Sequence, residues 1–429
     1  MRIPVIHLQP QLSATEPRWR ALLAGLFARS QFILGPEGEA FEREFAAFTG
    51  ARHAAGCGNG TDAITLALRD AGIGAGDEVL TTALSAPFTA VGIAATGARV
   101  RFADVDPDSL QMDPASAAAQ ITKRTRAIVV VHLYGQPAPV DAFTKLAPLV
   151  VQDAAQAHGA RYRGKPLTAW SPYVTYSFYP TKNLGALGDG GAITVNSARA
   201  AARLRAMRDG GRRGGMVALT SGVNSRLDEM QACYLRAFLE RLAEWNAARA
   251  RIAALYDEAL RDCPGVRLVR RTGESVHHLY VIRARSRDKL RAALAEQGIG
   301  TGVHYPAALH LNPAFAACGQ RRGSLPEAER AARAVASLPL WPYLPLAQAE
   351  EVAMAVRRFY TRWAGTFTDW PSGRFTPRRR SAASSRNGHS RARLRQGAGV
   401  TTPLCGRAPA RGSQSRNFKN ATGSRNMFA

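Results

Sequence analysis

Short apolar runs that alternate with helix-forming segments constrain the fold of this chain more than any other feature. Six such runs, each four to six residues long, occur between Thr61 and Val195, at 78–82, 100–103, 126–131, 149–152, 174–177 and 192–195. Runs of this length with helices between them are typical of a mainly parallel sheet that is buried on both faces. The sequence therefore predicts an α/β fold.

A smaller unit is expected after this region. A helical pattern extends from Arg226 to about Leu260, and strand-like runs at 266–269 and 278–283 precede a helix over 286–297. A chain of 429 residues, 46% of them hydrophobic, can bury one large core and one smaller core. We expect a large domain over residues 1–225, a linking helix with a small α/β domain over 226–365, and a tail over 366–429.

One lysine lies in a segment that can hold it at a fixed point. Lys182 follows Tyr179 and Pro180 and precedes a glycine-rich stretch that ends at Gly191. A lysine amine condenses with carbonyl groups, and its pKa falls readily when the side chain is partly buried. A surface lysine in a glycine-rich turn would give the same pattern. The neighbouring segments must decide between these interpretations.

An aspartate stands at the end of one apolar run. Asp153 follows Val150 and Val151, as expected for a buried parallel strand that delivers a carboxylate at its carboxyl end. Pyridoxal phosphate (PLP) chemistry requires one lysine for the aldehyde and one carboxylate against the pyridinium nitrogen. The aspartate could instead cap a following helix.

A glycine-rich segment before a helix-forming run is a candidate phosphate site. Gly58, Asn59 and Gly60 precede Thr61, and the helical pattern continues through 63–68. The free amide groups and the positive end of the helix dipole can bind an anion there. An ordinary N-cap formed by Thr61 or Asp62 is the alternative interpretation.

These three segments, in this order, resemble the DegT/DnrJ/EryC1/StrS family of PLP-dependent sugar aminotransferases. The resemblance covers roughly the first 365 residues and includes further blocks at 33–42, 76–79, 104–106, 131–136, 224–229 and 300–306. It implies PLP fold type I, the aspartate-aminotransferase-like architecture, in which a mainly parallel sheet forms the large domain. It also implies PLP as the cofactor.

The resemblance assigns roles to individual residues. Lys182 would bind the cofactor aldehyde and then carry protons, Asp153 would pair with the pyridine nitrogen, and Gln156 would lie beside the ring. The phosphate would be held by Gly60, Thr61 and Ser177. A lysine at position 182, where the dehydratase branch of the family has histidine, argues against that branch.

Other residues would complete the site. Asn224 would reach the phosphate of a neighbouring subunit, so the resemblance implies a homodimer. His304 and Tyr305 belong to a block that lines the sugar-binding cleft in the family. Arg212, with Arg208 and Arg213, is either a solvated charge or a contact for a nucleotide diphosphate.

The sequence departs from the family pattern at one position. The family places an aromatic ring over the cofactor, and an ungapped match puts Ala86 there, with Phe88 two residues later. Phe88 either reaches the cofactor because Pro87 redirects the chain, or is an ordinary core residue at the start of a helix.

The implied activity is conversion of a keto group on a nucleotide-linked hexose to an amine, with glutamate as donor. The blocks at 58–63, 132–136 and 300–306 look most like those of members that act on 3-keto sugars. A 4-keto sugar aminotransferase is the alternative within enzymes. A PLP-binding regulator with a nucleic-acid-binding tail is the alternative from another class.

Composition indicates a cytoplasmic protein without a structural metal. The five cysteines are scattered without zinc-binding spacing, which is typical of a reducing compartment. The first twenty residues lack the apolar core of a signal peptide, and no stretch reaches about 18 consecutive apolar residues, so no membrane span is expected.

The net charge of +25 is unusual, and residues 366–429 carry +12 of it. This tail has few apolar residues, so we expect it to be disordered. It could be inert, it could bind nucleic acid or another anionic partner through its arginines, or it could arise from out-of-frame translation. It has neither interleaved aromatic residues nor a recognised module, and nucleic-acid binding is therefore not expected.

Overall fold

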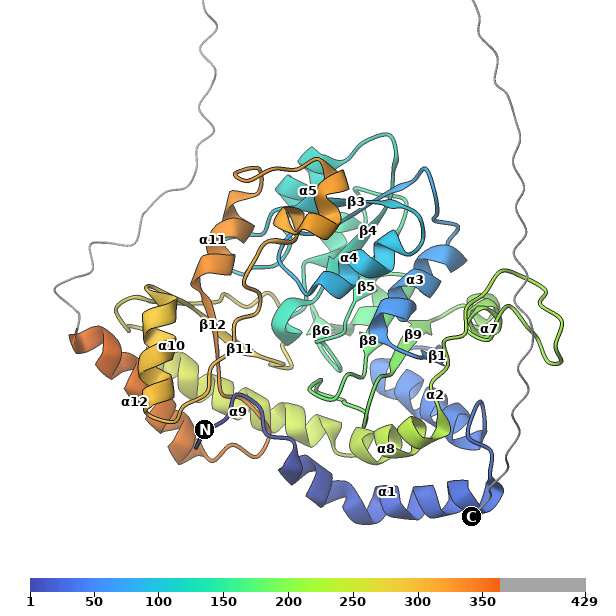
Figure 1. Ribbon diagram of the computed structural model, residues 1–429, viewed down its shortest axis with the longest axis horizontal. Coiled ribbons are helices and arrows are strands. Elements are labelled where there is room, and N and C mark those ends of the chain that lie inside the picture. Colours follow the sequence, from blue (N-terminus) through green and yellow to red (C-terminus); the bar gives the residue numbers. More distant parts are fainter. Residues whose placement is uncertain (363–429) are drawn as a thin grey trace, which may run out of the picture. The chain divides into compact units, whose positions relative to one another are not determined.

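The computed structural model describes residues 1–362 (Figure 1). Its largest element is a seven-stranded sheet with the order β1-β9-β8-β5-β4-β2-β3. The strands of this sheet are β1 (His53–Cys57), β2 (Glu78–Thr82), β3 (Arg99–Ala103), β4 (Thr125–Val131), β5 (Val150–Asp153), β8 (Tyr173–Ser177) and β9 (Gly191–Val195). A two-stranded ribbon, β6 (Arg161–Tyr162) with β7 (Lys165–Pro166), lies apart from it.

The sheet confirms the predicted α/β class and all six predicted strands. Strands β3, β2, β4, β5 and β8 are parallel neighbours, and only β9 runs antiparallel to both of its neighbours, β8 and β1. The reason is the connection from β8 to β9, which is a loop over 178–190 without the crossover helix that a parallel pair needs. This loop contains Lys182.

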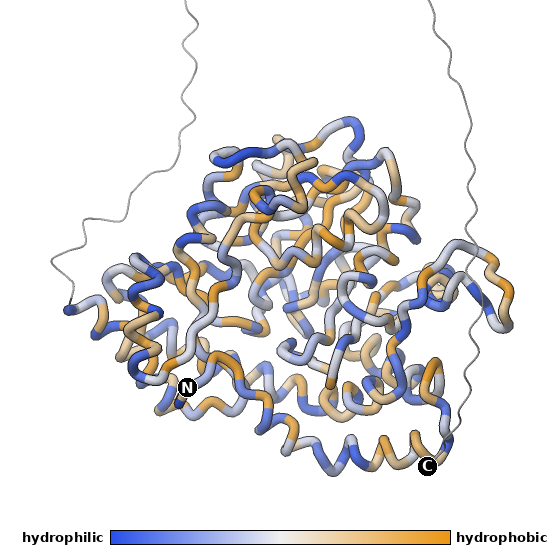
Figure 2. Tube along the Cα trace, viewed as in Figure 1, coloured by the Kyte–Doolittle hydropathy of each residue, from blue (hydrophilic) through white to orange (hydrophobic). Residues whose placement is uncertain are grey.

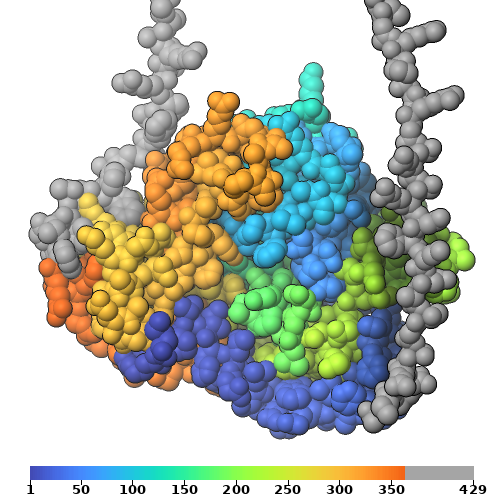
Figure 3. Space-filling view, viewed as in Figure 1, coloured from blue at the N-terminus to red at the C-terminus, as the bar shows by residue number. Residues whose placement is uncertain are grey.

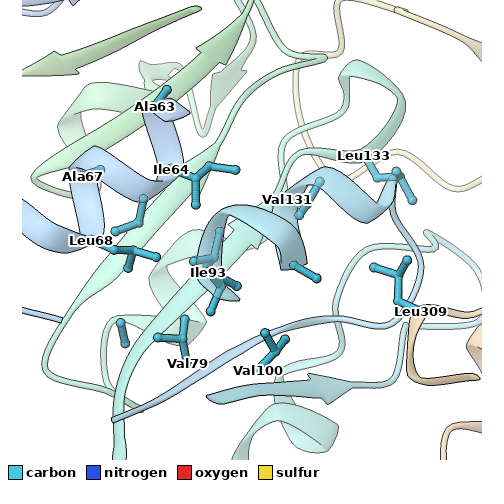
Figure 4. Packing of buried hydrophobic residues seen from close by; sticks show 14 of the residues in the cluster. Ala63, Ile64, Ala67, Leu68, Val79, Ile93, Val100, Val131, Leu133 and Leu309 are labelled. Carbon is cyan, nitrogen blue, oxygen red and sulfur yellow. The ribbon is translucent and has the colours of Figure 1, made fainter. Parts of the chain in front are cut away.

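Helices cover both faces of the sheet. They are α1 (Gln9–Arg29), α2 (Pro36–Thr49), α3 (Gly60–Asp70), α4 (Pro87–Ala94), α5 (Pro114–Gln120), α6 (Val140–Phe143), α7 (Ala198–Met207) and α8 (Glu229–Leu239). Short 3-10 turns occur at Leu133–Gly135, Leu167–Ala169, Leu309–Leu311 and Pro313–Cys318. Figure 4 shows side chains of α3 and α4 packed against Val79, Val100 and Val131 of the sheet. This buried contact fixes the amino-terminal ends of both helices relative to the strand ends.

A second core lies between the sheet and helices α1, α2 and α8. Phe41, Phe45 and Phe178 are fully buried there, and the ring of Phe178 meets the stacked rings of Phe41 and Phe45 edge to face. Figure 2 shows the hydrophobic segments gathered inside the molecule, where these elements meet. The loop that carries Lys182 therefore starts from a residue, Phe178, that is locked in the core.

The carboxyl-terminal part has its own antiparallel sheet of β10 (Val266–Leu268), β11 (Tyr280–Ala284) and β12 (Val335–Leu338). It is accompanied by α9 (Leu242–Leu260), α10 (Arg287–Glu296), α11 (Pro326–Ala334) and α12 (Leu346–Arg362). Ile3, at the start of the chain, is fully buried in this core.

The long helix predicted from Arg226 to Leu260 is in fact two helices, α8 and α9, with a break at Glu240–Arg241. The sequence has neither glycine nor proline there. The two helices have different packing partners, because α8 packs on α1 and α2 whereas α9 packs on α12. Tertiary packing therefore sets the break.

Within residues 1–362, no helix combines the length and the apolar character needed to cross a bilayer. The predictions for the tail, residues 366–429, lie outside the described residues.

Candidate active site

The amino-terminal end of α3 forms an anion-binding surface. The cap of this helix is Asn59, whose side chain accepts a hydrogen bond from the amide of Asp62 at 2.8 Å. The amides of Gly60 and Thr61 have no acceptor within the helix. A Cβ atom at Gly60 would lie 2.6 Å from the Cβ of Ser177, so only glycine lets the end of β8 approach so closely. The structure thus brings together the three residues predicted to hold a phosphate.

The loop over 178–190 is closed by its own backbone. The amide of Phe178 donates to the carbonyl of Gly190 and the amide of Ala186 donates to the carbonyl of Phe178, both at 2.7 Å. A Cβ atom at Gly185 would lie 2.3 Å from the carbonyl oxygen of Pro180, which explains the glycine at this turn. These contacts fix the backbone on both sides of Lys182.

A buried asparagine, Asn183, fixes the same loop through side-chain hydrogen bonds. The Nδ2 atom of Asn183 donates to the carbonyl of Val276 at 2.9 Å and to Oδ1 of Asn246 at 2.8 Å. Its Oδ1 lies 3.1 Å from Nδ1 of His278. Burial is the largest cause that lowers the pKa of His278 well below its ordinary value, so the ring is neutral and can donate to this oxygen. Asn183 therefore connects the Lys182 loop to α9 and to the segment before β11.

The environment of Lys182 makes its amine more nucleophilic than that of an ordinary lysine. Burial lowers the pKa of Lys182 from 10.5 to about 8, and the charge of Asp153 opposes this shift. Near neutral pH a useful fraction of the amine is therefore uncharged. The amine can condense with an aldehyde and can also carry a proton.

Asp153 ends β5 and is 5% exposed. Its Oδ2 accepts a hydrogen bond from Oγ1 of Thr89 at 2.7 Å, and its Oδ1 accepts one from the amide of Ala155 at 3.0 Å. Burial raises the pKa of Asp153 above its ordinary value, and these two bonds and the charge of Lys182 offset only part of that shift. The helix-cap interpretation is wrong, because turns and not a helix follow β5. The carboxylate is therefore fixed at the carboxyl end of β5, near the centre of the sheet.

Gln156 belongs to a chain of polar contacts beside Asp153. Its Oε1 accepts a hydrogen bond from the amide of Tyr134 at 2.6 Å, and its Nε2 donates to the hydroxyl of Tyr305 at 2.9 Å. The hydroxyl of Tyr134 donates to the carbonyl of His304. Gln156, which was predicted to bind the cofactor, is thus bonded directly to Tyr305 and is connected through Tyr134 to His304, the two residues predicted to bind the substrate.

The three remaining predicted residues, Phe88, Asn224 and Arg212, take no part in these contacts. Phe88 is 63% exposed in the first turn of α4, next to the Thr89 that contacts Asp153. Asn224 is exposed on the segment that follows α7. Arg212 pairs with Asp209 at 2.6 Å and lines a cavity of about 430 Å³ whose walls do not include Lys182 or Asp153. The structure thus does not bring Arg212 together with the lysine and the aspartate.

Arg208, considered in the sequence together with Arg212, is neither solvated nor available to a phosphate. It is 8% exposed, forms an ion pair with Glu42, and donates to the carbonyl of Gly56 at 2.6 Å. Its role is to join α7 to α2 and β1.

The sequence interpretation missed Thr89 and Asn183 as supports of the site. Thr89 contacts a carboxylate that is 64 positions away, and Asn183 contacts His278, which is 95 positions away. The position of Asn183 next to Lys182 was the only available signal.

Comparison with known proteins identifies this arrangement. The family model of the DegT/DnrJ/EryC1/StrS aminotransferases matches residues 17–357. The chain belongs to this family. It is 43% identical to the dTDP-3-amino-3,4,6-trideoxy-alpha-D-glucose transaminase of Streptomyces venezuelae, over 84% of this chain and 97% of that protein. It is 37% identical to the UDP-2-acetamido-2-deoxy-3-oxo-D-glucuronate aminotransferase of Pseudomonas aeruginosa, over 82% of this chain and 99% of that protein.

Solved structures agree with the family assignment. The crystal structure of DesV from S. venezuelae superimposes with a TM-score of 0.82 at 42% identity, covering 86% of this chain and all of DesV. The protein is therefore a PLP-dependent sugar aminotransferase of fold type I.

The described residues of this family member fit PLP. The helix end at Gly60 and Thr61 offers free amides to a phosphate, as expected for the anionic group of the cofactor. Lys182 supplies an amine of lowered pKa for the aldehyde, and Asp153 supplies a buried carboxylate for the pyridine nitrogen.

Proposed function

We propose that the protein transfers an amino group from glutamate to the 3-keto group of a nucleotide-linked hexose. The observation that carries the proposal is the electrostatic interaction of Lys182, which has a pKa of about 8, with the buried carboxylate of Asp153 at the carboxyl end of β5. The names of two relatives place an amino or keto group at carbon 3 of a nucleotide sugar, which favours this position over carbon 4.

In the proposed mechanism the protein residues hold groups and move protons. Bound PLP supplies an electron sink. Lys182 holds the cofactor and, once displaced by an amino substrate, accepts and returns the proton of the reacting carbon. Asp153, whose anionic form is favoured by the hydrogen bonds from Thr89 and the amide of Ala155, stabilises a positive pyridine nitrogen.

Other residues orient the reactants in this proposal. Gly60, Thr61 and Ser177 bind the phosphate, and Phe88 covers the ring from the first turn of α4. Gln156 lies beside the cofactor ring and donates a hydrogen bond to Tyr305, and Tyr305 and His304 face the sugar. Arg212, which lines the separate cavity of about 430 Å³, contacts the nucleotide diphosphate.

The proposed regiochemistry can be tested with purified protein and four nucleotide-linked sugars. We expect the 3-amino hexose to donate its amino group to 2-oxoglutarate at least about tenfold faster, in kcat/KM, than the 4-amino isomer, because placement of the reacting carbon sets the rate. The corresponding 3-keto and 4-keto sugars with glutamate test the forward direction. Faster turnover of the 4-isomers would establish the alternative, a 4-keto sugar aminotransferase.

We also propose that the enzyme is a two-fold dimer. Phe32 and Ile33 are 45% and 43% exposed, and Ile33 forms a backbone bridge with Asp228, two residues before the 41%-exposed Met230. Such a cluster of exposed apolar side chains is typical of an interface. The exposed Asn224 would then reach the phosphate site of the partner.

The dimer predicts complementation between two inactive variants. Coexpressed Lys182→Ala and Asn224→Ala subunits should regain up to about a quarter of the wild-type activity, because half of the dimers then contain one site free of both changes. The measurement is turnover of the mixture against each variant alone, with light scattering for the mass. A fully active monomer, or no gain on mixing, would contradict the proposal.

We place the enzyme in the cytoplasm. The four cysteines among residues 1–362 are all free and buried, which suits a reducing compartment. The regulator alternative depends on the tail, which lies outside the described residues.

A further inference from the structure

A cavity of about 210 Å³ lies between the amino-terminal end of α1, the Lys182 loop and α8. Lys182 and Pro180 form one side of it. In Figure 3 the green surface of this loop adjoins the blue surface of the amino-terminal segment. The volume is roughly seven times the 30 Å³ that one water molecule occupies in the liquid. A six-membered sugar ring with small substituents needs a space of this order.

The walls of the cavity are mostly apolar. The larger hydrophobic side chains that line it are Leu8, Leu12, Leu187, Tyr234 and Phe238. Tyr234 and Phe238 are 3% and 5% exposed, so these surfaces are well-packed parts of the second core. Apart from Lys182, no lining residue carries a charge. A ligand with its own charge would lose its hydration there without gaining a counter-ion other than the reactive amine.

One side-chain amide interrupts the apolar wall. Gln11, in the first turns of α1, lines the cavity and is 3% exposed. Its side-chain oxygen is buried without a hydrogen-bond partner among the described residues. Unpartnered buried amides are rare, because each costs free energy. A hydroxyl can both donate and accept, so it can bond to either end of this amide after rotation of the terminal group.

The geometry points to this cavity as the subsite for the non-reacting part of the sugar, and to a neutral deoxyhexose as the sugar. This assignment rests on the proposed function. A ring hydroxyl would bond to Gln11, and the deoxygenated carbons would pack against the leucine and aromatic side chains. A hydroxymethyl group would leave its hydroxyl unpaired against this wall, and a carboxylate would be desolvated there. The enzyme should therefore reject a nucleotide-linked uronic acid.

The test compares three sugars as amino donors to 2-oxoglutarate. They are nucleotide-linked 3-amino-3,6-dideoxyhexose, the matching 6-hydroxy sugar and the matching uronic acid. We expect kcat/KM to fall about tenfold or more for the 6-hydroxy sugar and further for the uronic acid. Equal values for the three sugars, or faster turnover of the uronic acid, would overturn the assignment. No transfer from any of them would instead contradict the proposed function itself.

Substitutions of residues that line the cavity provide a second test of the assignment. Gln11→Leu should lower kcat/KM for the 6-deoxy sugar about tenfold or more, mainly through KM, and should leave the absorption band of bound PLP unchanged. The matched control is Gln9→Leu, an exposed glutamine two residues away. If Gln11→Leu does not fold, Leu12→Phe fills the same space and should raise KM for all three sugars. Unchanged KM in a folded variant would show that the cavity holds only water.

Discussion

Replacing Lys182 by alanine is expected to abolish transamination, by more than about 10³-fold, while the protein stays folded and still binds PLP without a covalent bond. The loop should survive, because its closing hydrogen bonds come from the backbone of Phe178, Ala186 and Gly190. Wild-type protein should be yellow, and borohydride should fix the cofactor on Lys182, as mass spectrometry of peptides would show. The variant should give no such adduct.

A matched control is Lys165→Ala, which removes an exposed lysine on the β6–β7 ribbon and should leave turnover unchanged. The pH dependence gives a separate measurement. Because the pKa of Lys182 is lowered to about 8, acylation of the apoprotein at this residue should reach half its maximum near that pH, well below the value for an ordinary lysine. An active Lys182→Ala enzyme would refute the assigned mechanism.

The strand pattern was predictable because buried parallel strands have a local signal. The run predicted at 78–82 is identical to β2, and the run predicted at 126–131 differs from β4 by one residue. The antiparallel direction of β9 follows from the loop over 178–190, which has no crossover helix. The break between α8 and α9 had no local signal, because it depends on packing partners that are distant in the sequence.

The residues of the site were predictable, but the contacts that hold them in place were not. The resemblance selected residues that the structure brings together near the carboxyl ends of the strands, among them Gly60 with Ser177 and Gln156 with Tyr305. It gave no information on what holds them. The contact of Thr89 with Asp153, like those of Asn183 with the carboxyl-terminal part, exists only after the chain has folded.

Asp153→Asn should reduce kcat by about 10²-fold or more while preserving the shape of the side chain. The asparagine removes the charge that would stabilise a protonated pyridine nitrogen. It also removes the charge that raises the pKa of Lys182, so this pKa should fall further below 8. The first effect is measured by turnover, and the second by the pH dependence of Lys182 acylation in the apoprotein.

Thr89→Val removes a hydrogen bond to Asp153 but keeps the carboxylate, so it tests the hydrogen bond separately from the charge. The threonine hydroxyl donates to Oδ2 at 2.7 Å and lowers the pKa of Asp153, so its loss should raise that pKa without removing the carboxylate. Activity in Thr89→Val should therefore fall mainly at acid pH and recover as the pH rises and the carboxylate ionises, whereas Asp153→Asn should stay slow at every pH. Near-normal turnover in Asp153→Asn would mean that the carboxylate only supports the turn at Ala155. The combined action of Lys182 and Asp153 would then no longer account for the reaction.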